Sequence, residues 1–577
     1  MPGIRIPRRW LLLPLVLLLL LGWFEGSYGR SDYAGDAISY LDLSRAISSG
    51  QWKLAFSSLW GFGYPLLLCF TRILPLHSAA EEWQRIHALN LLILIATWFA
   101  GLFLLDAILL YQKAGDATSR EEGRRRKIAL SFIVFNCIFL PVEIGMNRVS
   151  RISPDMLVVC LYLLTSGLTL KIIRQPSQKM GILLGLSLGF GYITKAIFLP
   201  LSLLQIALLA VALISKKHKP VLILAPVITF LALAVPYASL MSWANGYLTT
   251  GEAGALNYSY FVNHLQHWAN WQGGPPEAGA PLHPTRRLMN ELPMFAFEGA
   301  PFAVTYPPQT NMPYWYHGYK HFFRWSYQRA ALGRNIRLLV HMLRVNAIFP
   351  TTFLAAACLF FLLTPRAMLR NLAAYWPVWM TASAMILSYL LIWADDRYVC
   401  GFLLCLALLL IVGSLSAVKP LSSRAFKTIA AIMIAGCAIH LAVITFTLAR
   451  TAKHGQTRAN DPQWIAGEWI AQQGFHRGEQ VGAIANETNM WCTWAYISGL
   501  HIVAEVASGD HNDYDLGHDV EEFWNAPPPV RARALSLFQS NGAAAVFSIG
   551  KPASVTPEPG WIQIPRTNVW VYRFGQS

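Results

Sequence analysis

Long apolar runs separated by short polar connections dominate the chain, for example at 10–21, 91–105 and 402–415. A helix that spans a bilayer needs about 20 mostly apolar residues. The pattern therefore predicts a polytopic α-helical membrane protein with about 11 transmembrane helices, followed by a soluble C-terminal α/β domain. The predicted spans are 10–24, 86–111, 128–146, 154–173, 180–194, 196–214, 220–240, 337–363, 372–393, 398–417 and 428–449.

Two of these segments, 180–194 and 196–214, also fit a single kinked element. The basic connections on either side keep the same sidedness only if both segments cross the membrane or neither does.

Composition supports the membrane assignment. Hydrophobic residues make up 55% of the 577 residues, charged residues only 13%, and the mean hydropathy is +0.40. Because ordinary soluble domains carry about 25% charged residues, a string of soluble domains is excluded.

The net charge of +16 indicates how the chain is oriented in the membrane. Twenty of the 46 Lys and Arg residues lie in six short connections that fall on one side if the chain crosses eleven times. Excess Lys and Arg in short loops marks the cytoplasmic face. We therefore expect a multi-pass protein of the inner membrane with a cytoplasmic N-terminus and a periplasmic C-terminal domain, and no nucleic-acid partner. The twenty basic residues of the six connections are Arg5, Arg8, Arg9, Lys113, Arg120, Arg124, Arg125, Arg126, Lys127, Lys171, Arg174, Lys179, Lys216, Lys217, Lys219, Arg366, Arg370, Lys419, Arg424 and Lys427.

The topology divides the chain into a transmembrane domain, 1–449, and an extracytoplasmic tail, 450–577. Two outer loops, 25–85 and 241–336, interrupt the transmembrane domain. The first contains an apolar piece, 65–76, that is too short to span. The second is rich in Trp, Tyr, Pro and Gly without obvious periodicity, and a loop of this length is usually functional.

The tail alternates between strand and helix patterns, which favours parallel pairing. It has no G-x-G-x-x-G or P-loop motif, so nucleotide binding is not predicted. The expected elements are a helix at 462–473, a strand at 480–485, a helix at 489–498, a strand at 501–506, a helix at 530–539, a strand at 543–549 and two edge strands within 561–574.

The first outer loop opens with a helical pattern from Asp36 to Gly50. At 3.6 residues per turn, Asp36 begins the stripe that continues with Tyr40, Leu43 and Ile47, and we expect this stripe to lie against the membrane. Asp42 and Arg45 lie roughly opposite and are spaced for an ordinary surface pair. The alternative interpretation of Asp36 is purely structural, because Asp commonly caps the N-terminus of a helix.

Charged side chains gather where outer loops meet predicted spans. Asp155 also suits a helix start, and the pair Asp395-Asp396 also suits a solvated turn. Arg and Lys at the membrane surface bind phosphate groups, and a neighbouring carboxylate can abstract a proton from a hydroxyl. The cluster predicts a lipid-phosphate substrate in the outer leaflet and an acceptor from outside. Its members are Asp32, Asp36, Arg148, Arg151, Asp155, Lys195, Asp396 and Arg397.

Four motifs in this order resemble the GT-C glycosyltransferases, a superfamily that includes protein O-mannosyltransferases, the aminoarabinose transferase of lipid A and the bacterial galacturonosyltransferase-like group. The resemblance covers about 400 residues, mostly as topology. The motifs are Asp36-Ala37-Ile38-Ser39-Tyr40-Leu41 with Tyr64-Pro65-Leu66-Leu67, then Ser153-Pro154-Asp155, Gly191-Tyr192-Ile193-Thr194-Lys195 and Asp396-Arg397-Tyr398.

The resemblance implies inverting transfer of a sugar from a polyprenyl-phosphate donor to an extracytoplasmic lipid, glycan or protein. It assigns the general base to Asp36, with Asp32 in reserve, and matches Asp155 to the second acid of the family. Lys195 and Arg397 match donor-phosphate contacts. Further donor contacts are expected from Arg148 and Arg151, and substrate positioning from Tyr40, Tyr64 and Asp396.

Two positions depart from the family pattern. The Asp-Glu pair is Asp36-Ala37, which weakens metal coordination at this loop, and the Lys-Pro pair is Tyr64-Pro65, which removes one phosphate contact. No cofactor is required by the sequence. A divalent metal is left open. His264 and His267 are its candidate ligands, and the alternative is that both are ordinary surface histidines.

Two other functions compete with the enzyme. The first is a membrane transporter or lipid flippase, but transporters place charges near the bilayer midplane and often contain internal repeats, and neither feature is found. The second is a non-catalytic surface protein whose tail binds a partner. The expected partners of the enzyme are the donor, the acceptor and membrane lipids.

Overall fold

The computed structural model describes most of the chain. The described residues are 7–28, 35–75, 78–112, 121–265, 271–273, 276–297, 304–345, 355, 372–415, 422–454, 460–485, 488, 491–507 and 520–575.

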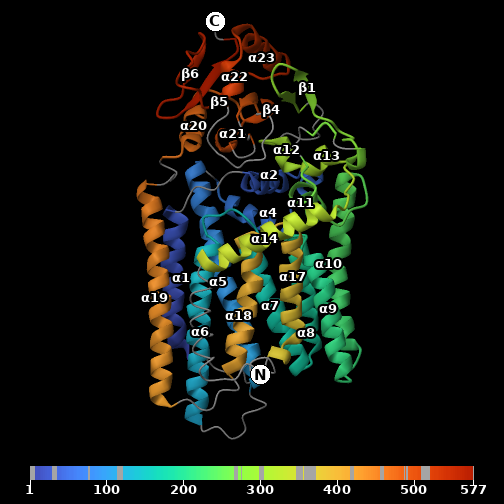
Figure 1. The fold of residues 1–577 in the computed structure, drawn as a ribbon, viewed down its shortest axis with the longest axis vertical. Helices are drawn as coiled ribbons and strands as arrows, with labels where there is room; N and C mark the ends of the chain where they lie inside the picture. The colour runs from blue at the N-terminus through green and yellow to red at the C-terminus, as the bar shows by residue number, and fades with distance from the viewer. Residues whose placement is uncertain are drawn as a thin grey trace.

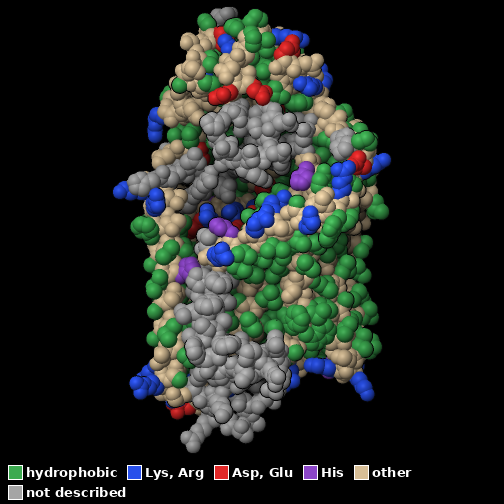
Figure 2. Space-filling view, viewed as in Figure 1, with side chains coloured by type: hydrophobic (Ala, Val, Ile, Leu, Met, Phe, Trp, Pro, Cys, Tyr) green, Lys and Arg blue, Asp and Glu red, His purple; other side chains and the backbone are tan. Residues whose placement is uncertain are grey.

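A bundle of long helices forms one half of the molecule, and a mixed sheet with its helices caps one end of the bundle (Figure 1). We call this end the sheet end. Figure 2 shows an apolar belt around the visible face of the bundle between ends that carry Lys and Arg. The long helices are α1 (Arg8–Tyr28), α5 (Ala79–Gln112), α6 (Glu121–Met146), α7 (Asp155–Arg174), α8 (Gln178–Thr194), α9 (Phe198–Ser215), α10 (Val221–Asn245), α17 (Trp376–Ile392), α18 (Asp396–Ser414) and α19 (Ser423–His454).

Eight of the described helices are long and apolar enough to cross a membrane, and the apolar α17 is shorter. The polytopic membrane fold with a C-terminal part containing strands is thereby confirmed, whereas the number eleven is not. The segments 180–194 and 196–214 form separate helices, α8 and α9, so the single kinked element is wrong.

The predicted span 337–363 starts differently from the expectation. Its first residues belong to α14 (Trp325–Val345), which runs obliquely across the sheet end of the bundle (Figure 1). This helix is amphipathic rather than uniformly apolar, and Asn335 donates from Nδ2 to the carbonyls of Leu390 and Ile392. Most of the remaining residues of that predicted span lie outside the described part of the chain.

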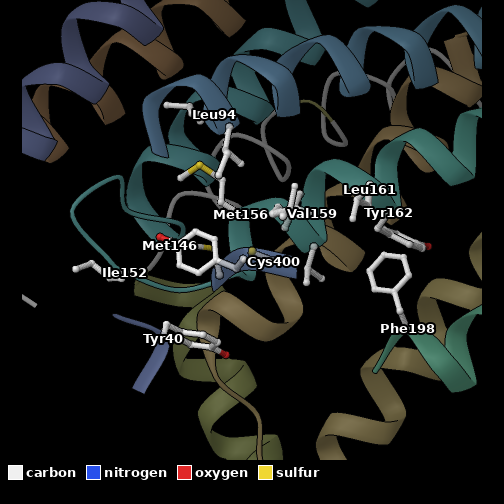
Figure 3. Packing of buried hydrophobic residues seen from close by; sticks show 14 of the residues in the cluster. Tyr40, Leu94, Met146, Ile152, Met156, Val159, Leu161, Tyr162, Phe198 and Cys400 are labelled. Carbon is white, nitrogen blue, oxygen red and sulfur yellow. The ribbon is translucent and has the colours of Figure 1, made fainter. Parts of the chain in front are cut away.

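Helix α7 forms the centre of the bundle. Of its 20 residues, 16 are buried, whereas α1, α10 and α19 bury little of their apolar windows. Figure 3 shows side chains from α5, α6, α7, α9 and α18 packed together, with Tyr40 joining from outside the bundle. The outer helices thus present their apolar surface to lipid, and α7 anchors the end at which the charged residues meet.

Helix α8 packs closely on α10 through a row of glycines. A Cβ on Gly185 would lie 2.0 Å from Oγ1 of Thr229 and 2.3 Å from the carbonyl oxygen of Pro226. Gly181 and Gly189 continue this face at four-residue spacing, the small-residue pattern that lets membrane helices approach each other. The end of α8 that carries Thr194 is thereby held at the sheet end.

Short elements fill the space between the bundle and the sheet. They include helices from the outer loop 241–336, for which no periodic structure was predicted. Helix α2 occupies the middle of this layer in Figure 1. These elements are α2 (Asp36–Ser48), α3 (Trp52–Ala55), α4 (Gly63–Cys69), η1 (Phe70–Arg72), α11 (Ala253–Phe261), η3 (Pro276–Ala278), α12 (Pro307–Thr310) and α13 (Met312–Tyr316).

The sheet has seven strands in the order β1-β2-β4-β3-β5-β7-β6. β3 pairs in parallel with β4 and β5, as the strand–helix alternation predicted, and the outer pairs are antiparallel. Of the two predicted edge strands, only β6 is at an edge. The strands are β1 (Arg286–Met289), β2 (Met294–Ala296), β3 (Gln480–Ile484), β4 (His501–Val506), β5 (Ala545–Ile549), β6 (Trp561–Gln563) and β7 (Val569–Arg573).

The helices beside the sheet are close to the predicted ones. α21 begins at Thr493, four residues after the predicted start at 489, and the short helix α22 (Glu521–Asn525) had no predicted counterpart. Strands β1 and β2 come from the outer loop 241–336, so the sheet is not built from the tail alone. The helices are α20 (Pro462–Ile470), α21 (Thr493–Ser498), α22 (Glu521–Asn525) and α23 (Pro528–Ser540).

The environment of α2 corrects a prediction. Nearly all of this helix is buried, because the 304–310 segment and the sheet domain cover the face that was expected to be solvated. Asp42 is 3% exposed, and its two carboxylate oxygens accept hydrogen bonds of 3.0 Å each from the backbone N–H and the hydroxyl of Thr305. The expected surface pair with Arg45 exists at 3.8 Å, but its acid is buried.

Candidate functional site

Four charged side chains from four separate elements meet at the sheet end of the bundle. Nη2 of Arg397 lies 3.2 Å from Oδ2 of Asp36, and its Nε lies 3.6 Å from Oδ2 of Asp155. Lys195 forms an ion pair with the other oxygen of Asp155. The structure therefore brings together Asp36, Asp155, Lys195 and Arg397, which the sequence placed at one membrane face.

All four groups lie at helix ends: Asp36 is the first residue of α2, and the other three lie at the ends of long bundle helices. Asp155 is the first residue of α7 after Pro154, and Lys195 follows the last residue of α8. Arg397 lies in the first turn of α18, where the carboxylate of Asp395 accepts a hydrogen bond from its backbone N–H. Because these three ends all reach the sheet end, their side chains converge without any irregular backbone inside the bundle.

A close backbone approach holds Lys195 beside the first outer loop. A Cβ on Gly61 would lie 2.0 Å from the carbonyl oxygen of Thr194, and one on Gly63 would lie 2.5 Å from Oγ1 of Thr194. Only glycine permits contact this close. The loop is therefore seated directly on the end of α8, one residue before Lys195.

The two acids differ sharply in accessibility. The side chain of Asp155 is 2% exposed and is paired with two cations, whereas that of Asp36 is 37% exposed. Gln309 lies beside Asp36, with its Nε2 3.5 Å from Oδ1. The backbone carbonyl of Gln309 accepts hydrogen bonds from the indole of Trp60 and the hydroxyl of Ser39. Asp36 is thus held at both oxygens and can still be reached by a substrate.

Tyrosine rings form one wall of this cluster. Nζ of Lys195 lies 4.0 Å from the ring centre of Tyr398, and the hydroxyl of Tyr398 accepts a 3.0 Å hydrogen bond from Arg397. Tyr389 stacks on Tyr398 with 5.3 Å between ring centres. The aromatic faces favour the cationic groups and hold them in place.

Tyr40 and Tyr64, both predicted to position substrate, lie in succession beneath Asp36. Burial, followed by the charges of Asp36 and Asp155, raises the pKa of Tyr40, so its hydroxyl stays neutral and able to donate. Tyr64 is fully buried, contacts the edge of the Tyr40 ring and donates a 2.9 Å hydrogen bond to Asn90. Because Tyr64 is fully buried and its hydroxyl donates to Asn90, it supports Tyr40 from behind and does not present its hydroxyl to a substrate.

The remaining predicted residues are less tightly connected to the centre. Arg151 and Asp396 form a 3.7 Å ion pair at its margin. Arg148 is exposed, and no hydrogen bond or ion pair links it to the four central groups among the residues that the structure describes. Asp32 lies outside the described residues.

Three neighbours of the site were not among the predicted site residues. Tyr398 and Asp395 stood next to predicted residues in Asp395-Asp396-Arg397-Tyr398, so their adjacency was an available signal. Gln309 had none, because Pro307-Pro308-Gln309-Thr310 carries no recognisable motif and reaches Asp36 only through the tertiary fold.

Metal ligands do not gather in the described part of the chain, where no group of three His, Cys, Asp or Glu side chains could hold an ion. His264 is described, but His267 lies outside, so the histidine-pair hypothesis stays a prediction.

The charge arrangement suits an anionic group beside Asp36. Nη1 of Arg397 makes no hydrogen bond to a described residue, and Lys195 has three ammonium hydrogens of which Asp155 takes one. A guanidinium and an ammonium with spare donors can bind phosphate oxygens. An exposed carboxylate nearby can accept a proton from a hydroxyl.

Comparison with known proteins identifies the fold but not a sequence family. No protein-family model matches the sequence, and no curated protein matches it. The structure is similar to ArnT from Cupriavidus metallidurans in the apo state, with a TM-score of 0.54 and 13% identity over 98% of this chain and 97% of that chain. ArnT bound to undecaprenyl phosphate gives a TM-score of 0.50 at 13% identity over 98% of both chains.

A second similar structure is the Archaeoglobus fulgidus oligosaccharyltransferase in complex with Zn and sulfate. Its TM-score is 0.51 at 11% identity, over 93% of this chain and 67% of that chain. At such low identity the similarity is one of fold. It confirms that the chain has the fold expected from its resemblance to the GT-C glycosyltransferases.

Proposed function

We propose that this protein is a glycosyltransferase of the inner membrane that moves a sugar from a polyprenyl-phosphate donor to an extracytoplasmic acceptor. The fold is shared with ArnT, which has been crystallised with undecaprenyl phosphate, and with an oligosaccharyltransferase. The basic connections orient the sheet end to the periplasm by the positive-inside rule.

One observation carries the proposal. An exposed carboxylate, Asp36, is paired with Arg397, and a buried carboxylate, Asp155, holds both Arg397 and Lys195 in place. Because the buried acid is already paired twice and inaccessible, the two carboxylates take different roles. Asp36 acts on the acceptor, and Asp155 positions Lys195 and Arg397 for the donor phosphate.

The transfer step follows from these positions. Asp36 accepts the proton of the acceptor hydroxyl as the oxygen attacks the anomeric carbon of the sugar. The bond between that carbon and the phosphate oxygen breaks, and the lipid phosphate leaves with the electron pair. Arg397 and Lys195 stabilise the charge that develops on it. Attack opposite to the leaving phosphate inverts the anomeric configuration.

Other residues support this arrangement. Gln309 and Arg397 orient the two oxygens of Asp36, Tyr40 and Asp396 position substrate, and Arg151 adds positive charge at the margin. Arg148 and Asp32 stay predicted contributors to donor binding and proton abstraction. The reaction as proposed uses side chains of this chain alone.

The test is covalent transfer by the full chain purified in detergent. Undecaprenyl-phosphate sugars with a labelled sugar are supplied with a cell-envelope extract, and label in a new covalent product is measured by mass spectrometry. Detergent removes both the compartments and the membrane potential, so a transporter or flippase would give no product. Donor-dependent product formation supports the enzyme, and its absence with every sugar tested would contradict it.

A further inference from the structure

A polar cavity lies on the other side of α2 from Asp36. It has a volume of about 710 Å³ and separates α2 from the sheet domain, a size within the range of about 300–1,000 Å³ seen for small-molecule sites. Its lining includes Arg45, Arg72, Arg477, Tyr496 and His501.

Only one of the three arginines in this cavity is fully neutralised. Arg72 lies 2.6 Å from Oε1 of Glu82, and it also donates to the hydroxyls of Ser44 and Tyr496. This set satisfies the guanidinium of Arg72 within the protein. Arg72 therefore forms a structural link between η1, α5 and the sheet domain.

Arg45 is compensated only weakly. Its nearest acid is Asp42 at 3.8 Å, and both oxygens of that carboxylate already accept hydrogen bonds from Thr305. The guanidinium of Arg45 lies over the ring of Tyr496, 3.6 Å from its centre. The stacked ring holds the planar fork in place, and Nη2 donates a 3.5 Å hydrogen bond to the backbone carbonyl of Tyr496. The other N–H groups of Arg45 are the ones that can bind an oxygen ligand.

Arg477 has no ion-pair partner within the described ranges. Arg45 and Arg477 line the same cavity, and the charge of Arg45, followed by burial, lowers the pKa of the Arg477 guanidinium, while Tyr496 and Glu82 oppose this shift. Glu82, the acid whose charge also acts on Arg477, is already paired with Arg72. An anion between Arg45 and Arg477 would remove the repulsion between these two cations.

We propose that this cavity binds an anionic group, a phosphate or carboxylate, that the acceptor carries apart from its reacting hydroxyl. This inference rests on the proposed glycosyltransferase function and assigns the acceptor to the anionic glycans or glycolipids. Asp36 and Asp42 are six residues apart on α2, a rise of about 9 Å. Residues 304 and 305 line the cavity, and the same segment continues to Gln309 at Asp36. One acceptor molecule of a few sugar units could thus reach both places.

The binding test uses the full chain in detergent. Inorganic phosphate and glucuronate, with neutral glucose as the uncharged control, are titrated while thermal stability is followed. Both anions should stabilise the protein, and Arg477→Gln should weaken their apparent affinity about tenfold or more, as expected for loss of a charge-assisted contact. Arg477→Lys, which keeps the charge, should lose less.

Arg533→Gln is the matched control, since Arg533 is an exposed arginine of the sheet domain paired with Glu291 outside the cavity. Stabilisation that is absent, or equal in Arg477→Gln and wild type, would overturn the anion site.

The transfer assay then tests what the anion belongs to. Glucuronate, which lacks the phosphate group assigned to Lys195 and Arg397, should inhibit transfer competitively with the acceptor and not with the donor, and Arg477→Gln should raise the KM for acceptor while leaving the KM for donor unchanged. Competition with the donor, or with neither substrate, would overturn the assignment to the acceptor. If no sugar is transferred at all, the proposed function and the acceptor assignment fail together, and the titrations still decide on the anion site.

Discussion

Arg397 and Asp36, which are 361 residues apart in the sequence, lie 3.2 Å apart between Nη2 and Oδ2. The contact joins the first turn of α18 to the first outer loop. Because Arg397 also lies 3.6 Å from Asp155 through its Nε, a single guanidinium spans the exposed acid and the buried one. The relative position of base and phosphate contacts therefore depends on this side chain.

Arg397→Lys should abolish most transfer without unfolding the protein. Lysine keeps the positive charge that the buried Asp155 needs, but an ammonium is a point charge and cannot contact both acids as the planar fork does. We expect kcat to fall about 100-fold, the order of loss produced by misplacing a reacting group by about 1 Å. The measurement is kcat together with thermal stability, with Arg533→Lys as a control. Full activity in Arg397→Lys would show that the bridge is dispensable.

Gly61→Ala should impair the site, although Gly61 is not one of its four charged residues. The new methyl group would lie 2.0 Å from the carbonyl oxygen of Thr194, so the loop or the end of α8 must move, and Lys195 moves with it. We expect a loss of about 1–3 kcal/mol of stability, typical of overpacking, and a raised KM for the donor.

Gly254→Ala provides the comparison for Gly61→Ala. This helical glycine has no neighbouring atom within 4 Å of the added methyl group, so donor binding should stay at the wild-type level. If Gly61→Ala kept the wild-type KM for the donor, the contact between the loop and the end of α8 would not determine the position of Lys195.

The stability of the α2 region should depend on pH through Asp42. Burial raises the pKa of Asp42 above its ordinary value, although Arg45 and Thr305 oppose the shift. Between the ordinary pKa of about 3.9 and the raised value, the folded state binds a proton that the unfolded state has lost. The contribution of Asp42 to stability is therefore fully present below the ordinary pKa and falls as pH rises through the raised one.

Comparison with Asp42→Asn isolates this contribution. As pH rises through this window, the thermal midpoint of the wild type should fall relative to that of Asp42→Asn. Above the window the difference between the two midpoints should stay constant. A difference that is constant from pH 4 upward would contradict the raised pKa.

The charged centre was largely predictable from sequence because charge near a membrane is costly and therefore informative. Asp155, Lys195 and Arg397 each stand next to a long apolar run, so the end of the run fixes the depth of the side chain. Their meeting in space follows once all three runs are placed with the same end outward.

The surroundings of α2 could not be predicted in the same way. Its helical periodicity was clear, but the partners of its second face, Thr305 and Tyr496, lie hundreds of residues away and carry no pattern that links them to Asp42 or Arg45. For the same reason β1 and β2 were missed. They are short, and their strand character comes from pairing with β4 rather than from their own alternation.

The start of the predicted span at 337 failed for a related reason. Apolar residues in α14 continue toward an apolar segment, so hydropathy alone joins them into one span. The arginines of α14, together with the contacts of Asn335 at the end of α17, place the helix across the bundle instead.

Proton abstraction by Asp36 is the central step of the proposed transfer, and substituting this residue tests it most directly. Asp36→Asn preserves the size of the side chain and removes the group that accepts the proton. We expect the rate of covalent sugar transfer to fall by a factor of about 100–10,000, the usual contribution of a general base, while donor binding and thermal stability stay near the wild-type values. Transfer at the wild-type rate by a folded Asp36→Asn protein would contradict the account.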